Sequence, residues 1–172
     1  DLTLAQAWED WFGVHHTIRV DVTAVKSPLR SLEFTTLKIK DAICDRFRDQ
    51  FGKRPSVDTH NPDIRIVGFL DTRHFTIYLD TSGEALFKRG WRLDTGDAPL
   101  RENLAAGLLR VAGWKPGIPL FDPMCGSGTI LAEAAQMVQG IPPGARRRFA
   151  FEAFNDFDPA PWNAMKNAIK VN

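Results

Sequence analysis

Residues 120–129 read LFDPMCGSGT, and this glycine-containing stretch is the most informative part of the chain. The apolar run Ile118–Phe121 leads into it and predicts a short buried strand. Apolar residues then recur at helical spacing over Thr129–Val138. Because Gly126 and Gly128 tolerate backbone dihedrals that other residues avoid, a tight loop is expected between strand and helix. The pattern predicts the start of a parallel α/β sheet.

The loop is expected to bind an anionic group. The first amides of a helix lack partners within it and carry partial positive charge, which suits a carboxylate or a phosphate. The phosphate loop of nucleotide hydrolases needs a Lys after its last glycine, and the third glycine of the dinucleotide fingerprint would fall at Leu131, so neither pattern matches. S-Adenosylmethionine remains, with its carboxylate at the helix amides and its ammonium at Asp122. A purely structural turn is the alternative interpretation.

The other segments of the second half are consistent with such a domain. Residues 94–99 are rich in turn-forming residues and are interpreted as a linker. Helical apolar spacing returns over residues 100–112. The run Pro142-Pro143-Gly144 interrupts the pattern, and residues 159–171 predict a final amphipathic helix.

The first half has a different pattern. Residues 2–12 carry an apolar stripe typical of a helix, and residues 17–25 alternate as a half-buried strand does. A second helix is expected from a cap at Ser31 to a stop at Gly52. Two short alternating runs, 64–70 and 75–79, predict a hairpin. Together they predict a small α+β layer with a mostly antiparallel sheet.

Composition narrows the function classes. The chain has 172 residues and a formal net charge of +1, so any nucleic-acid contact must come from local basic patches. No apolar run is long enough for a membrane span. Cys44 and Cys125 have no zinc spacing, the four His are scattered, and no metal site is expected. Unpaired cysteines make a reducing, cytoplasmic setting the default.

Two further motifs carry a resemblance. Residues 88–92 read KRGWR and residues 99–103 read PLREN. With the glycine stretch, they resemble the THUMP-containing methylases of large-subunit ribosomal RNA, which methylate the exocyclic amine of a guanine. The resemblance implies a THUMP-like RNA-binding domain over residues 1–92. It also implies the N-terminal portion of a Rossmann-like, S-adenosylmethionine-dependent methyltransferase domain over residues 93–172.

The resemblance also assigns candidate site residues. Arg101 and Glu102 match the helix that flanks the methionine end of the cofactor, although a solvated charge pair is the plainer interpretation. The implied cofactor-binding residues of the loop are Asp122, Pro123, Cys125, Gly126, Ser127, Gly128 and Thr129. Lys and Arg bind phosphate with little sequence information. The RNA candidates are Lys26, Arg30, Lys38, Lys40, Arg65, Lys88, Arg89, Arg92 and the cluster 146–148.

One expected motif is missing. Members of this family carry Asn-Pro-Pro-Tyr or a close variant after their fourth strand, and this sequence has none; Asn155-Asp156-Phe157-Asp158-Pro159 is only superficially similar. No catalytic residue is therefore assigned, and the chain is expected to be a truncated form with weak or no methyl transfer. Two other functions stay open, an RNA-binding module without catalysis and a DNA adenine methyltransferase.

Overall fold

The computed structural model describes residues 2–92 and 98–169. The chain forms two compact units, one of Asp1–Gly83 and Phe149–Phe157, and one of Glu84–Arg148 and Asp158–Asn172. They are called unit 1 and unit 2 below. The predicted domain boundary after residue 92 stays a prediction, because a compact unit and a family domain need not end at the same residue. Most of the predicted linker 94–99 lies outside the described residues.

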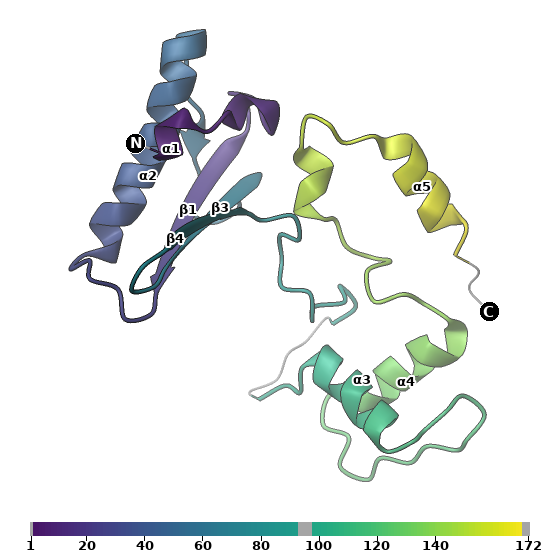
Figure 1. Cartoon of the computed structure of the whole chain (residues 1–172). Coiled ribbons are helices and arrows are strands. Elements are labelled where there is room, and N and C mark those ends of the chain that lie inside the picture. Colours follow the sequence, from purple (N-terminus) through teal and green to yellow (C-terminus); the bar gives the residue numbers. More distant parts are fainter. Residues whose placement is uncertain (1, 93–97, 170–172) are drawn as a thin grey trace. The chain divides into compact units, whose positions relative to one another are not determined.

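Unit 1 contains a four-stranded sheet in the order β2-β1-β3-β4 (Figure 1). Its strands are β1 (Thr17–Ala24), β2 (Ser56–Val57), β3 (Ile64–Leu70) and β4 (Phe75–Leu79). The predicted strand and hairpin are confirmed, but the expectation of a mostly antiparallel sheet is wrong. β1 runs parallel to both β2 and β3, and only β3 and β4 are antiparallel. A hairpin signal reports the pairing of neighbouring strands only, so it does not reveal how β1 pairs.

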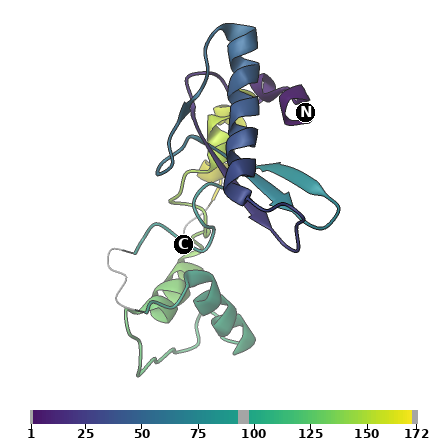
Figure 2. The ribbon, with the colours of Figure 1, turned by 90° about the vertical axis from the view of Figure 1, so that its left-hand side faces the viewer.

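The helix α2 (Leu32–Phe51) lies along one face of this sheet (Figure 2). It begins as predicted, because the Ser31 hydroxyl accepts a hydrogen bond from the Phe34 amide at 3.1 Å. It ends at Gly52, whose φ of +67° is the left-handed conformation that favours glycine. Local capping chemistry therefore sets both ends of α2.

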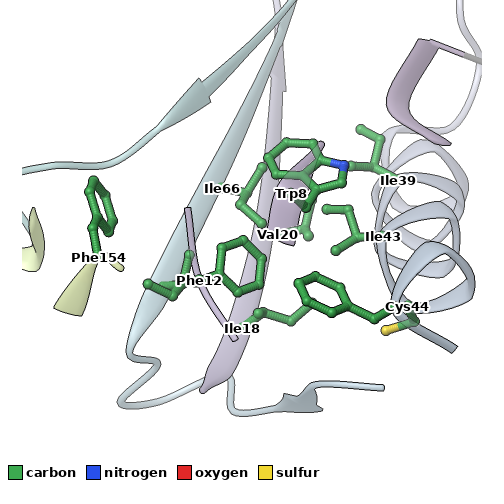
Figure 3. Packing of buried hydrophobic residues seen from close by; sticks show 11 residues of the cluster. Trp8, Phe12, Ile18, Val20, Ile39, Ile43, Cys44, Ile66 and Phe154 are labelled. Carbon is green, nitrogen blue, oxygen red and sulfur yellow. The ribbon is translucent and has the colours of Figure 1, made fainter. Parts of the chain in front are cut away.

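The core of unit 1 lies between α2 and the sheet (Figure 3). Because side chains alternate between the two faces of a strand, those of Ile18, Ile64 and Ile66 point toward α2, where they are fully buried. Phe47 of α2 packs on Phe12, with ring centroids 5.2 Å apart. These aromatic and branched side chains exclude water from one continuous cluster, which is the main stabilising contribution of unit 1.

The N-terminal segment departs from the expected single helix. It forms α1 (Leu2–Ala5) and the 3-10 helix η1 (Trp8–Asp10). The buried indole of Trp8 donates to the Thr3 carbonyl at 2.8 Å. In a continuous helix that carbonyl would accept from the amide of Ala7. The Trp8 indole therefore takes the place of a helical donor at the point where the helix is interrupted.

A late segment of the chain returns to unit 1. It contains the 3-10 helix η2 (Ala150–Ala153), and the Phe151 amide donates to the Thr81 carbonyl at 3.1 Å. The ring of Phe154 is buried edge-on against Trp11. The Asn155 side chain donates to the Glu9 carbonyl at 2.9 Å. Asn155, which the sequence places in a motif-like run, thus has a structural role here.

Unit 2 contains α3 (Glu102–Val111) and α4 (Thr129–Gln139), which pack on each other, and α5 (Pro159–Asn167). The three predicted helices are confirmed, the last one shorter than expected. The strand predicted at Ile118–Phe121 is wrong, since those residues are irregular and the Phe121 side chain is 86% exposed. A strand needs a partner for its backbone groups, and among the described residues of unit 2 none is in strand conformation. Within the described residues, no helix is long and apolar enough to cross a membrane.

Candidate cofactor-binding site

The glycine stretch forms a tight loop that ends at the start of α4. The Asp122 carboxylate accepts from the Met124 amide at 3.1 Å, which closes a local turn. Gly126 has a φ of +53° and Gly128 a φ of +74°. The Gly128 amide donates to the Cys125 carbonyl at 2.8 Å. The loop therefore requires glycine for its backbone, as the sequence predicts.

The loop directly before α4 is exposed to solvent. Gly128 occupies the capping position and has no side chain to accept from the first amides of α4. A Cβ built on Gly126 or Gly128 would meet no atom within 4 Å. Residues 123–127 are all exposed, so no side chain fills this corner. The first amides of α4, with their partial positive charge, thus follow directly on an exposed loop, an arrangement that suits an anionic ligand group.

Arg92 connects this loop to the start of α3. Its guanidinium pairs with Glu102 at 3.0 Å and donates to the Leu100 carbonyl at 2.9 Å. It also donates to the hydroxyls of Ser127 at 3.1 Å and Thr129 at 2.9 Å. Glu102 and Thr129 are buried, so this polar network is part of the packed interior of unit 2. The plainer interpretation of Glu102 as a solvated charge does not hold.

A cavity of about 290 Å³ lies on the α3 side of Arg92. Arg101 and Glu102 both line it, together with Phe87 and Pro99. The Arg101 guanidinium lies 5.1 Å from the centroid of the Phe87 ring, a cation–π distance. The two residues assigned to the methionine end of the cofactor therefore line a cavity that shares Arg92 with the glycine loop.

A second arginine–carboxylate pair lies in the same unit, and its acid was missed in the sequence. Arg89 pairs with Glu133 of α4 at 3.3 Å, with both side chains buried. It also donates to the Leu86 carbonyl at 3.3 Å. Glu133 is the only charged residue of α4, and this isolation in an apolar helix was the available signal.

The candidate RNA residues fall into two groups. Lys26, Arg30 and Lys38 are exposed on unit 1, at and just before α2. Others are engaged in ion pairs, as shown by Lys40 with Asp41 at 2.6 Å, Arg65 with Asp21 at 3.8 Å and Lys88 with Glu84 at 2.5 Å. Arg89 and Arg92 are directed into unit 2 as described above, and Arg147 donates to the Ala85 carbonyl at 3.2 Å. Arg146 and Arg148 of unit 2 are exposed as well, so among the described residues Lys26, Arg30, Lys38, Arg146 and Arg148 are the exposed candidates outside these ion pairs.

Within residues 2–92 and 98–169, the cysteines and histidines form no further candidate site. Cys44 is buried and Cys125 exposed, and both thiols are free. Burial raises the pKa of the Cys44 thiol. The His16 ring accepts from the Gly13 amide at 3.1 Å, and burial lowers its pKa. Among the described residues, no group of three or more His, Cys, Asp or Glu has a metal-binding arrangement.

Comparison with known proteins gives two family matches. Residues 1–80 match the THUMP domain, and residues 89–171 match the RMKL-like methyltransferase domain. A curated relative from Psychromonas ingrahamii, the ribosomal RNA large subunit methyltransferase K/L, is 46% identical over 165 residues. The match covers 95% of this chain and 22% of that protein, so the chain spans about a fifth of the relative's length.

Solved structures agree with the fold. A predicted N6-adenine-specific DNA methylase from Listeria monocytogenes superposes with a TM-score of 0.83 at 32% identity, covering 98% of this chain and 44% of that one. A putative methyltransferase complexed with SAH superposes with a TM-score of 0.80 at 30% identity, covering 99% and 47%.

Proposed function

We propose that unit 2 binds S-adenosylmethionine and that unit 1 binds structured RNA, because residues 1–80 match the THUMP domain and residues 89–171 match the RMKL-like methyltransferase domain. The chain thus has the parts of an RNA methyltransferase that hold the cofactor and the substrate. The reducing, cytoplasmic setting expected from its free cysteines belongs to the same proposal.

The observation that carries the cofactor proposal is the open glycine loop at the start of α4. Gly126 and Gly128 lie directly before the first turn of α4, whose amides have no partners within the helix, and a Cβ at Gly126 would meet no atom within 4 Å. The exposed backbone of residues 123–127 allows a ligand to approach closely. The amides of α4 would hold a carboxylate, and Asp122 would attract an ammonium.

Bound S-adenosylmethionine would supply a methyl group on a sulfonium centre, whose positive charge makes the methyl reactive. The chain's own contribution is to hold the amino-acid end in one orientation. The α4 amides, Asp122, Arg101 and Glu102 are the groups proposed for it. Cys125 is not proposed as a nucleophile, because an amine needs no covalent enzyme intermediate to accept a methyl group.

The test compares Gly126→Ala with Gly113→Ala. Both glycines have positive φ and open space around them, and both lie in unit 2. Each substitution is therefore expected to cost about 1 kcal/mol of backbone strain. Only the methyl at Gly126 would occupy the ligand's space, so the Kd for S-adenosylhomocysteine measured by calorimetry should rise at least about tenfold in that variant alone. Equal affinity in both variants and the unchanged chain would contradict a cofactor role for the loop.

The RNA proposal rests on the exposed charges at the start of α2. Phosphate contacts by Lys26, Arg30 and Lys38 would give affinity without base readout, and structured RNA is read mainly by its shape. We extend the proposal to 23S ribosomal RNA with a guanine exocyclic amine as the target. The curated relative's name supports large-subunit ribosomal RNA as the substrate, and the resemblance of the KRGWR and PLREN motifs supports the guanine target.

The double variant Arg30→Glu/Lys38→Glu tests the RNA surface. A matched control, Lys53→Glu/Arg54→Glu, makes the same charge change at exposed positions beyond the other end of α2. From Lys38 to the end of α2 at Phe51 the helix rises about 20 Å, which separates the two sites. RNA affinity and its salt slope should fall only in the first variant. An equal loss in both would mean that net charge, and not this surface, governs binding. Duplex DNA serves as a competitor, and stronger binding to it than to RNA would favour a DNA substrate.

We propose further that this chain transfers methyl groups weakly or not at all. The Asn-Pro-Pro-Tyr motif, which would hold the target amine, is missing from its residues. Incubation with radiolabelled S-adenosylmethionine and 23S ribosomal RNA should leave the RNA unlabelled. Stoichiometric labelling of the RNA would refute this and would place the catalytic groups among residues not yet assigned.

A further inference from the structure

The segment of residues 84–92 carries two arginines, and each of them pairs with a glutamate on one of the two packed helices of unit 2. Arg89 reaches Glu133 of α4, and Arg92 reaches Glu102 of α3. Gly90 lies between the two arginines with a φ of +77°, a conformation that a residue with a side chain rarely adopts. All four charged side chains are largely buried, which makes each pair a strong constraint on its helix.

The two pairs differ in one respect. The Arg92 guanidinium also donates to Ser127 and Thr129, the residues on either side of Gly128. Gly128 is the capping residue of α4 and has no side-chain acceptor of its own. A guanidinium has five N–H donors in a fixed plane, and here it holds the two hydroxyls and the Glu102 carboxylate together.

We propose that Arg92 is a positioning residue for the cofactor loop. It fixes the backbone of Ser127–Thr129 so that the first amides of α4 keep one direction before a ligand arrives. Arg89 fixes α4 through Glu133 without contacting the loop. Arg92 thus acts through the loop, a role that differs from the phosphate contact that a basic residue near an RNA-binding domain would suggest.

A lysine at position 92 cannot make the same set of hydrogen bonds. Its ammonium is a single point charge with three donors, and one nitrogen cannot reach acceptors that Arg92 serves from Nε and both terminal nitrogens. Arg92→Lys therefore keeps the charge but releases part of the loop. Arg89→Lys is the matched control, because it weakens a buried pair on the same segment and leaves the loop contacts intact.

The experiment measures three quantities on the full chain: melting temperature, hydrogen exchange of the Gly128 and Ala132 amides, which donate to the carbonyls of Cys125 and Gly128, and the Kd for S-adenosylhomocysteine. Both lysine variants should lower the melting temperature. Only Arg92→Lys should speed exchange of those amides, and it should raise the Kd, each by about tenfold, because charge-assisted hydrogen bonds are lost. Exchange and Kd like those of the unchanged chain, or equal changes in both variants, would overturn the proposal.

The measurement of Kd rests on the proposed cofactor function, whereas the measurement of hydrogen exchange does not. If the unchanged chain binds no S-adenosylhomocysteine, the proposed function fails, and the exchange rates still decide whether Arg92 orders the loop. Should Arg92→Lys fail to fold, Ser127→Ala takes its place. It removes one acceptor at an exposed position and leaves the Arg92–Glu102 pair. Faster exchange at the loop amides in Ser127→Ala supports the proposal, and unchanged exchange overturns it.

Discussion

The stability of unit 1 is predicted to depend on pH through Glu9. Its carboxylate accepts from the Arg46 guanidinium, with one Nε contact of 2.7 Å, and from the Gln50 amide at 2.9 Å. Arg46 also donates to the Leu4 carbonyl at 3.0 Å, so the group ties α1 and η1 to α2. The Arg46 guanidinium lowers the pKa of Glu9 from 4.5 to about 2. Glu9→Gln removes the charge and keeps the size of the side chain.

The shift sets the expected magnitude. Each unit of pKa is worth about 1.4 kcal/mol, so a fall from 4.5 to about 2 has an upper limit of roughly 3.4 kcal/mol. Both side chains are 19% exposed, and screening by solvent reduces this to about 1–2 kcal/mol. Because the folded-state pKa lies below the unfolded one, the contribution is complete above about pH 5 and is lost as the pH falls toward 2.

Hydrogen exchange of the α2 amides, followed during urea unfolding, isolates the stability of unit 1 from that of unit 2. At pH 7, Glu9→Gln should be about 1–2 kcal/mol less stable than the unchanged chain, and the difference should shrink as the pH falls from 5 to 3. Asp10→Asn is the control, since it removes a carboxylate at the adjacent position. A loss that is equal in both variants, or one that is constant with pH, would refute the assignment to the Glu9–Arg46 pair.

Three further substitutions test the packing of unit 1 by the same exchange measurement. Gly68→Ala should destabilise it by about 1–3 kcal/mol, because the new Cβ would lie 3.2 Å from a methyl of Val22 in a close-packed interior; an unaltered stability would contradict this packing. Ser31→Ala should cost about 1 kcal/mol and fray the first turn of α2, since it removes the cap on the Phe34 amide; protection unchanged at that turn would argue against the cap. Phe47→Ala should cost about 3–5 kcal/mol, as its ring is 1% exposed, and a loss below 1 kcal/mol would count against its place in the core.

Several features followed from short-range patterns in the sequence. Ser31 and Gly52 bound α2, the alternation of 64–70 and 75–79 forms the hairpin, and Gly126 and Gly128 adopt positive φ in the loop before α4. Each of these depends on dihedral preferences and hydrogen bonds within a few residues. The composition of a short segment is therefore enough to predict them.

Other features required the folded chain. β1 pairs in parallel with β3, where the Asp63 carboxylate accepts from the Thr17 amide at 2.8 Å across 46 residues of sequence. Phe154 joins the core of unit 1 from beyond α4. A run of apolar residues predicts that the segment will be buried, but it does not predict the segment against which it packs. For this reason a mostly antiparallel sheet was expected.

The candidate site divides in the same way. The sequence alone determined that a glycine loop would open α4 and expose its amides, because glycine's lack of a Cβ is a property of the residue itself. It could not determine that Arg92 would hold that loop through Ser127, 35 residues away, while Arg89 holds Glu133. An arginine has the same charge on a surface or in an interior. Only the tertiary structure, which brings distant carboxylates and hydroxyls within hydrogen-bonding distance, decides which of these roles it has.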